Sequence, residues 1–214
     1  MRIVHFGHAC TLLETEGARI LIDPGTFSAG FEGERELDAI LITHQHFDHL
    51  DVERLPALLA ANPGARLIVD PGSAEAVRKI GAEFQIANPG DAFEIGSSGS
   101  SAVNVVGGEH AVIHEEIPVI PNVGYLVDHG AFYHPGDSFF VPEQQIDVLG
   151  LPTGAPWLKA GEAVDYLRAV SPRLAVPIHE AVLARPQMHY NLFADLAPEG
   201  TEVKVLDVGE PVKL

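Results

Sequence analysis

Residues 39–49 read Ala-Ile-Leu-Ile-Thr-His-Gln-His-Phe-Asp-His, an apolar run followed directly by three histidines and an aspartate. The apolar run is short and rich in branched side chains, which predicts a buried β-strand over 39–43. The polar cluster then lies where a strand ends and a loop begins, the position at which α/β proteins place their chemistry. A solvent-facing loop that is histidine-rich by chance is the alternative, and so dense a cluster argues against it.

The spacing within this cluster also constrains its geometry. Imidazole and carboxylate groups are ligands for zinc, iron and related ions. His44 and His46 are two residues apart, so on an extended backbone both side chains point to one side. Asp48 and His49 follow in a predicted turn and can point at a second position nearby. The spacing therefore favours two metal ions over one.

Composition limits the class of protein. A chain of 214 residues that is 46% hydrophobic can bury a sizeable core, and we expect one domain over residues 1–214. The net charge of −17 argues against a surface for nucleic acid or anionic membranes. A single cysteine, Cys10, excludes an internal disulfide framework and fits a reducing cytoplasm, the location we expect. No segment is typical of a signal peptide or a transmembrane helix.

Apolar periodicity and turn residues predict the order of the elements. Strands are expected at residues 2–5, 11–15, 20–23, 39–43, 67–70, 92–95, 102–106, 123–127, 131–134, 148–151 and 174–177. Helices are expected at 52–61 with Asp51 as the cap, from Ser73 as the cap through residue 80, at 159–170 and at 187–196. The Gly/Ser stretch at 96–101 is expected to form a turn. Two halves emerge, each with strands before helices, which suits an α/β protein of four layers, an αβ/βα sandwich.

Two further histidines follow predicted strands. A typical metal site needs a third nitrogen. His110 follows the expected strand 102–106 and a Gly-Gly pair that lets the backbone bend sharply, and His114 is the alternative. His179 ends the strand 174–177 and would complete a second site; the alternative is a hydrogen-bonded histidine at a strand end.

The motif His44-x-His46-x-Asp48-His49 resembles the signature of the metallo-β-lactamase-fold hydrolases. Ile-Val-His-Phe-Gly-His at 3–8 and Ala-Arg-Ile-Leu-Ile-Asp-Pro at 18–24 resemble the opening hairpin of the branch that includes the ascorbate-6-phosphate lactonase. Gly136-Asp137-Ser138 and Val-Pro-Ile-His at 176–179 resemble later motifs of the family. The resemblance covers nearly the whole chain and implies this fold, on which many different reactions occur.

The resemblance also implies a ligand set. Two divalent metal ions would be held by His44, His46, Asp48, His49, His110, Asp137 and His179. Asp137 would bridge the ions at a separation of roughly 3.5–4 Å, although taken alone its Gly-Asp pair also suits an ordinary turn. Zinc is the first choice, with manganese and iron as alternatives.

Other residues near these motifs have open roles. Asp48 is expected to accept a proton as well as to bind metal. His8 is expected to be catalytic, acting beside the ligands or on the substrate, with a structural role as the alternative. Asp23 could fix the tautomer of a ligand imidazole or belong to an Asp-Pro-Gly turn. His129 is expected at an exposed hairpin tip, His189 on an exposed helix face, and His134 is undecided.

The predicted function is hydrolysis at a binuclear metal site. A metal-bound hydroxide would attack a small-molecule ester, lactone or phosphodiester. His46 stands where diiron relatives of this fold carry glutamate, which favours hydrolysis over redox chemistry. The alternatives are a metal-dependent nuclease or phosphodiesterase and a non-catalytic metal-binding protein. We expect a small-molecule substrate and neither nucleic acid nor a membrane as partner, and the sequence leaves a homo-oligomer open.

Overall fold

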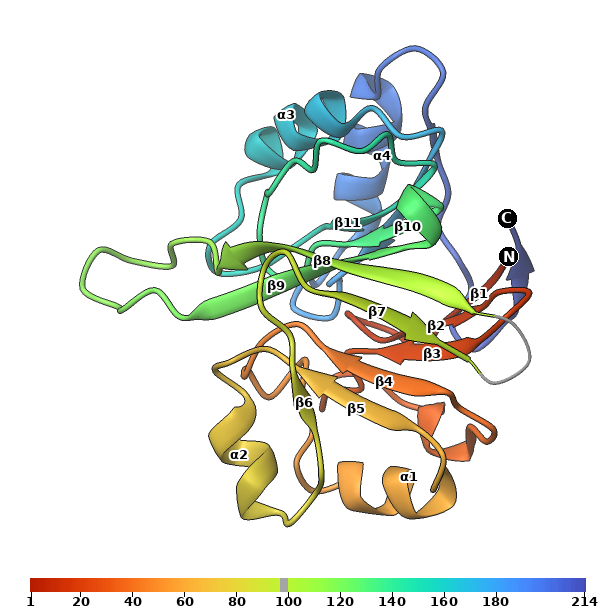
Figure 1. The fold of residues 1–214 in the computed structure, drawn as a ribbon. Coiled ribbons are helices and arrows are strands. Elements are labelled where there is room, and N and C mark those ends of the chain that lie inside the picture. Colours follow the sequence, from red (N-terminus) through yellow and green to blue (C-terminus); the bar gives the residue numbers. More distant parts are fainter. Residues whose placement is uncertain (97–99) are drawn as a thin grey trace.

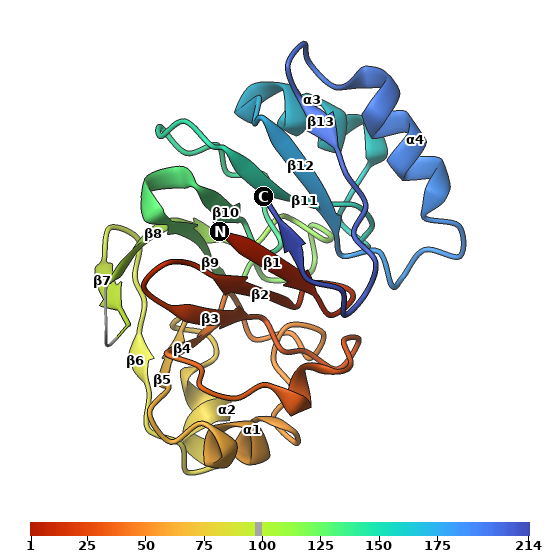
Figure 2. The ribbon, with the colours of Figure 1, turned by 90° about the vertical axis from the view of Figure 1, so that its right-hand side faces the viewer.

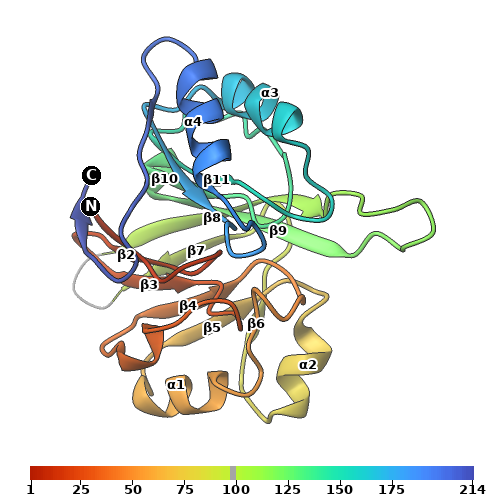
Figure 3. The same cartoon turned by 180° about the vertical axis from the view of Figure 1, so that it is seen from behind.

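A computed structural model of the chain describes residues 1–96 and 100–214 as two mixed β-sheets packed face to face, each with helices on its outer side (Figure 1). Helices α1 (Leu55–Ala61) and α2 (Ala74–Lys79) cover one sheet. Helices α3 (Ala160–Val170) and α4 (Gln187–Leu196) cover the other, as the view from behind also shows (Figure 3). The four-layer αβ/βα sandwich expected from the sequence is confirmed.

The first sheet contains strands from both ends of the chain. Its order is β14 (Val212–Lys213), β1 (Arg2–His5), β2 (Thr11–Glu14), β3 (Arg19–Ile22), β4 (Ala39–Ile42), β5 (Arg66–Val69) and β6 (Gln85–Ile86). Strands β14, β1, β2 and β3 pair antiparallel, and β3 to β6 pair parallel. The two ends of the chain therefore lie side by side (Figure 2).

The second sheet repeats this plan. Its order is β13 (Glu202–Val203), β12 (Leu174–Ile178), β11 (Val148–Pro152), β10 (Phe132–His134), β9 (Pro121–Val127), β8 (Ser101–Glu109) and β7 (Ala92–Ile95). Strands β7 to β10 pair antiparallel, and β10 to β13 pair parallel. Two 3₁₀ turns, η1 (Phe31–Gly33) and η2 (Asp128–Gly130), lie in the connections.

Strand β4 shows how the apolar run at residues 39–43 determines the fold. Ala39 and Leu41 face the core between the sheets, whereas Ile40 and Ile42 face the core under α1 and α2. A strand buried on both faces needs a continuous apolar run, without polar alternation. Full burial of each large aliphatic side chain contributes roughly 1.5–3 kcal/mol. This burial fixes the end of β4, and hence the loop that follows it.

Most expected elements are confirmed, and the differences have local causes. Helix α1 begins at Leu55 rather than at residue 52, and Pro56 lies at its start, where no N–H is needed. The Asp51 carboxylate instead accepts the backbone N–H groups of Glu53 and Arg54 at 2.9 and 3.0 Å, which holds the turn before the helix. The two-residue strands β6, β13 and β14 were not expected, because they are too short to show a period.

Two other expectations concern loops. Ser73 precedes α2 but does not cap it with its side chain, because its hydroxyl donates to the Asp70 carboxylate. The turn expected at 96–101 includes residues 97–99, which lie outside the described residues. Among residues 1–96 and 100–214, no helix combines the length and the apolar character needed to cross a membrane.

The backbone at Gly25 locks the loop after β3 against the loop after β4. A Cβ atom at this position would lie 1.8 Å from the carbonyl oxygen of Asp48. The next residue along the chain, Thr26, donates its N–H to the Phe47 carbonyl at 2.9 Å. Glycine is therefore required here by close approach of two backbones.

We predict that Gly25→Ala lowers the free energy of unfolding by about 3 kcal/mol, the upper part of the range for overpacking, because backbone rather than a flexible side chain must move. Gly161→Ala in α3 is the matched control, since its Cβ would meet nothing within 4 Å. That variant should be neutral or stabilised by up to about 1 kcal/mol. Urea unfolding of both variants measures the difference, and equal stability would contradict this packing.

Candidate metal centre

Eight chemically related side chains gather between the ends of the two sheets in two groups, each of which could hold a metal ion. His44, His46, His110 and Asp137 form the first group, and His8, Asp48, His49 and His179 form the second. Within each group one ligand atom per residue lies within 4.8 Å of the others. The structure thus brings together all seven ligands expected from the sequence, and His8 with them. His114 is exposed and lies in neither group.

Each side chain reaches the site from the end of a strand. The loop after β4 carries four members, and His179 follows β12 directly. His110 follows β8, which runs three residues beyond the expected end at residue 106, because Gly107 and Gly108 stay paired with β9 and do not end the strand. Their φ values of +79° and +143° still favour glycine at both positions. Parallel strands place their carboxyl ends at one edge of a sheet, so β4 and β12 deliver groups that are far apart in sequence.

Asp137 is placed by its own neighbours. Gly136 has φ +63°, and a Cβ atom there would lie 2.3 Å from the Asn122 side-chain oxygen. That oxygen accepts the Asp137 N–H at 2.9 Å. The Gly-Asp pair therefore forms a bend of the chain, held by Asn122, which directs the carboxylate to the site.

The first group is built from three imidazoles. His44 Nε2 and His46 Nδ1 lie 3.1 Å apart. His110 Nε2 lies 3.4 Å from Asp137 Oδ2. The three nitrogens and the carboxylate oxygen surround one point, as a metal site with nitrogen and oxygen ligands requires.

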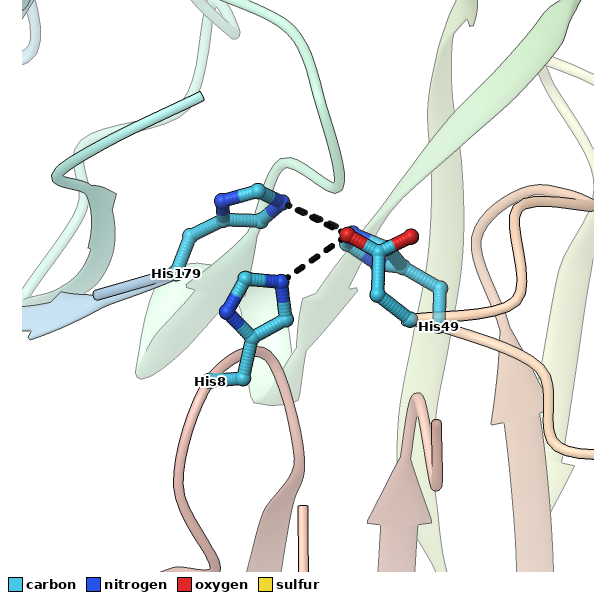
Figure 4. A group of neighbouring side chains, drawn as sticks. His8, His49 and His179 are labelled. Atoms are coloured by element: carbon cyan, nitrogen blue, oxygen red, sulfur yellow. Dashed lines mark hydrogen bonds and ion pairs between the residues drawn. The ribbon is translucent and has the colours of Figure 1, made fainter. Parts of the chain in front are cut away.

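The second group has the same design. His49 Nε2 and His179 Nε2 lie 3.1 Å apart. The rings of His8 and His179 both point at the same oxygen, Asp48 Oδ2, at 3.0 and 3.6 Å (Figure 4). Asp48 therefore belongs to this group and not to that of its sequence neighbour His46.

Asp137 faces both groups at once. Its Oδ1 lies 3.1 Å from His49 Nε2 and 3.1 Å from His179 Nε2, in the second group. Its Oδ2 faces His110 in the first group and also accepts the indole N–H of Trp157 at 2.8 Å. One carboxylate oxygen thus points into each group, the arrangement of a bridging ligand.

Hydrogen bonds fix the tautomers of four imidazoles. In each ring Nδ1 lies against an acceptor, so in the neutral ring the proton is on Nδ1 and Nε2 keeps a lone pair directed into the site. The acceptors are Thr43 Oγ1 for His44 at 3.1 Å, Asp23 Oδ2 for His49 at 2.7 Å, the Ala111 carbonyl for His110 at 2.6 Å and the Gly154 carbonyl for His179 at 2.5 Å.

Asp23 supports two of these rings. It is fully buried, accepts the Thr43 N–H at 2.8 Å and the Thr43 hydroxyl proton at 2.6 Å, and contacts His49 Nδ1 directly. Because the Thr43 hydroxyl donates to Asp23, its oxygen is free to accept the His44 Nδ1 proton. Asp23 therefore has the tautomer-fixing geometry that was one of its two expected roles.

The site has a strongly perturbed electrostatic environment. Burial raises the pKa of Asp137, but His179 and His49 outweigh it and hold that pKa well below its usual range. Burial lowers the pKa of His49, but Asp137 and Asp23 outweigh it and raise the pKa well above its ordinary value. Burial, followed by the charge of His49, lowers the pKa of His44. The buried carboxylates thus attract positive charge, whether as protons or as metal ions.

The donor set fits metal ions. His110 Nε2 and Asp137 Oδ1 are buried and lack a hydrogen-bond partner among the described residues, although both face other polar atoms of the site. Opposed imidazole nitrogens that each carry a lone pair repel one another, and a cation between them converts that repulsion into coordination. The residues present are therefore suited to two ions that share Asp137.

The remaining histidines differ from the ligands. His134 is buried with Nε2 on the Ala9 carbonyl at 2.9 Å, a contact within the fold. His129 is exposed, as expected. The expectation that His189 is exposed is wrong, because it is half-buried in α4 with its ring 6.2 Å from that of Phe193.

Sequence reasoning missed three supporting residues, Thr43, Asn122 and Trp157. Each contacts a candidate ligand, but none carries a motif. Thr43 precedes His44 directly, and this adjacency could have suggested a hydrogen bond. Trp157 lies 20 residues from Asp137 in the sequence, so only the fold brings its indole to the carboxylate.

Comparisons with known proteins agree with this architecture. Residues 2–179 match the family described as "Beta-lactamase superfamily domain". A solved structure, the metallo hydrolase Igni18 from Ignicoccus hospitalis, superposes with a TM-score of 0.74 at 23% identity over 99% of this chain and 97% of that one. The chain therefore has the metallo-β-lactamase fold.

Curated relatives refine the assignment. Protein Rv0786c of Mycobacterium tuberculosis is 54% identical over 86% of each chain. UPF0173 protein PYRAB01190 of Pyrococcus abyssi is 31% identical over 84% of this chain and 83% of its own. UPF0173 metal-dependent hydrolase TV0864 of Thermoplasma volcanium is 27% identical over 100% and 99%. The chain belongs to the UPF0173 family of metal-dependent hydrolases within the metallo-β-lactamase superfamily.

We predict that His110→Ala weakens binding of one metal ion by about tenfold or more, because it removes a buried nitrogen of the first group. His114→Ala should keep full metal content, because His114 is exposed and outside both groups. Elemental analysis after dialysis against a graded series of chelator concentrations compares the two variants. Metal loss in the His114 variant and not in the His110 variant would show that the assignment is reversed.

A second prediction concerns Asp137→Asn. The amide keeps the size of the side chain and forms turns well, so the metal-free variant should still unfold cooperatively. It has no charge to share between two cations, so activity should fall by more than about 100-fold, beyond the range typical of residues next to metal ligands. Calorimetry and a hydrolysis assay together test this, and full activity with full metal content would refute the bridging role.

Proposed function

We propose that the protein is a binuclear hydrolase of small molecules, and that its two metal ions are zinc. The placement of Asp137 supports this most directly, because one carboxylate oxygen faces each group of ligands. A donor set rich in imidazole, with only carboxylate oxygens besides, suits zinc. When bound, two metal ions would supply an activated water as the nucleophile and would balance negative charge that develops on the substrate.

The chain's own residues would orient this chemistry. His46 and Asp48 are the partly exposed members of the two groups, so substrate would approach from their side. Burial raises the pKa of Asp48, but the hydrogen bond to His8 and nearby imidazoles outweigh it and bring the pKa to about 2. Asp48 is therefore ionised at neutral pH and can accept a proton in a reaction cycle. We propose no side-chain nucleophile.

Two aromatic rings beside the ligands indicate the substrate class. Phe47, between His46 and Asp48, is 60% exposed, and Phe27 is 42% exposed. Their rings meet edge to face with centroids 5.4 Å apart. Exposed aromatic groups of this kind bind apolar parts of a ligand. We therefore place esters and lactones with an apolar portion first, and the resemblance of residues 3–24 to the lactonase branch supports lactones.

Nucleic acid is the less favoured substrate. The net charge of −17 repels a phosphate backbone. Arg78-Lys79 is the only pair of adjacent basic residues in the sequence, and it lies far from the ligand motifs along the chain. A small phosphodiester stays within the proposal, because two cations can bind one anionic group. The buried single Cys10 is consistent with the reducing cytoplasm, the location we propose.

The test combines metal analysis with a substrate panel. Protein reconstituted with zinc should carry two ions per chain and hydrolyse an aromatic ester or a lactone faster than single-stranded RNA or duplex DNA. Low salt gives nucleic acid its best chance, and His46→Ala excludes a contaminating enzyme. A maximum of one ion per chain would refute the binuclear site, and efficient nucleic-acid cleavage that the His46 variant loses would refute the substrate class.

A further inference from the structure

His8 lies close enough to the second group to act as a fourth protein ligand, yet its hydrogen bonds differ from those of the other imidazoles. The backbone N–H of Ala181 donates to His8 Nδ1 at 3.3 Å. In His44, His49, His110 and His179 the same nitrogen faces an acceptor instead. The ring of His8 is therefore in the opposite tautomer.

The tautomer determines whether His8 Nε2 can donate a hydrogen bond or bind a metal ion. A ring nitrogen that accepts a hydrogen bond carries no proton, so the single ring proton of His8 is on its other nitrogen. Because Nδ1 accepts a hydrogen bond, that proton is on Nε2, which lies 3.0 Å from Asp48 Oδ2. A protonated Nε2 has no lone pair for a metal ion, but it is a good donor to a carboxylate.

The surrounding backbone holds this ring in place. Gly7 and His8 both have positive φ values, +84° and +51°, in the turn between β1 and β2. The N–H of His8 donates to Glu180 Oε1 at 2.9 Å, and its carbonyl accepts the His179 N–H at 2.8 Å and His5 Nε2 at 2.8 Å. These bonds tie the turn to the segment after β12 on both sides of the residue.

The ring itself is enclosed. Its centroid lies 3.8 Å from that of His179, its neighbour in Figure 4. The His8 ring also lies 5.1 Å from that of Phe27, and the side chain is fully buried. The other neutral tautomer, with its proton on Nδ1, would place the Nε2 lone pair against Asp48 and would remove the acceptor from the Ala181 N–H. That exchange leaves a donor unpaired and sets a lone pair against a carboxylate, so the observed orientation is the stable one.

We propose that His8 is a positioning residue that holds Asp48 by donating its Nε2 proton, and that it is not a metal ligand. This inference rests on the proposed function, in which Asp48 serves the second metal ion and accepts a proton. The second ion would then take Asp48, His49, His179 and the bridging Asp137 as its protein ligands. His8 would fix the direction of the Asp48 carboxylate from the side away from solvent.

Two amide variants that differ in reach test the donor. The amide nitrogen of His8→Gln reaches the place of Nε2 and can donate to Asp48, whereas the shorter amide of His8→Asn reaches only the place of Nδ1. Neither amide replaces an imidazole as a zinc ligand. Asparagine tolerates a positive φ better than glutamine does, so the thermal midpoint of His8→Asn should equal or exceed that of His8→Gln.

We expect both variants to bind two zinc ions per chain. The kcat of His8→Asn should fall by about 10–100-fold, the usual effect of losing a hydrogen bond to a ligand, while KM changes little. His8→Gln should recover most of that loss in spite of its lower stability. A merely structural role would make activity follow stability, so equal loss of kcat in both variants, or activity in the order of stability, would overturn the proposal.

The tautomer of His8 can also be determined by NMR, without an activity assay. Histidine-¹⁵N NMR of the zinc-loaded protein, with His8→Asn to identify the resonances, should show a proton on His8 Nε2 and zinc on neither His8 nitrogen. Zinc bound at His8, or only one zinc ion in both variants, would overturn the proposal. A wild-type protein that hydrolyses nothing would refute the proposed function, while the NMR spectra and the metal content would still decide the role of His8.

Discussion

The metal centre depends on one requirement: a ligand imidazole that directs its Nε2 lone pair inward needs an acceptor for its Nδ1 proton, and four rings of the site meet it. Each acceptor comes from the same half of the fold as the ring it holds. Asp23 and Thr43 lie at the ends of β3 and β4 and hold His49 and His44, whereas the carbonyls of Ala111 and Gly154 lie in loops after strands of the other sheet and hold His110 and His179. Each half therefore sets the tautomers of its own ligands, and the packing of the two sheets then brings ligands from both halves together in each group.

This requirement also explains the buried charges. Asp23, Asp137 and several imidazoles share a region that solvent hardly reaches, and burying unpaired charges is costly. Asp137 is stabilised by His49, His179 and the Trp157 indole N–H. In the metal-free chain protons balance part of the negative charge, and cations can take their place. The groups of the site can therefore take either protons or metal ions as the balancing positive charge.

The sequence allowed much of this to be predicted, and the limits have physical reasons. The run 39–43 reveals a doubly buried strand because burial on both faces leaves a continuous apolar signal. His110 could be preferred over His114 because it follows a strand and a pair of glycines. The strand β6 could not be predicted, since a two-residue pairing carries little local signal. The later start of α1 does have a local signal, because Pro56 suits the first turn of a helix. The tautomer of His8 depends on the N–H of Ala181, far along the chain, so no motif could encode it.

Trp157 is the single tryptophan of the chain, and its indole N–H is bound to the carboxylate that faces both groups of ligands. Its ring lies 6.2 Å from that of His110 and is almost wholly buried. All tryptophan fluorescence of this protein therefore originates within a few ångströms of the metal centre. The emission is a natural optical probe that can report cation arrival and departure without a label.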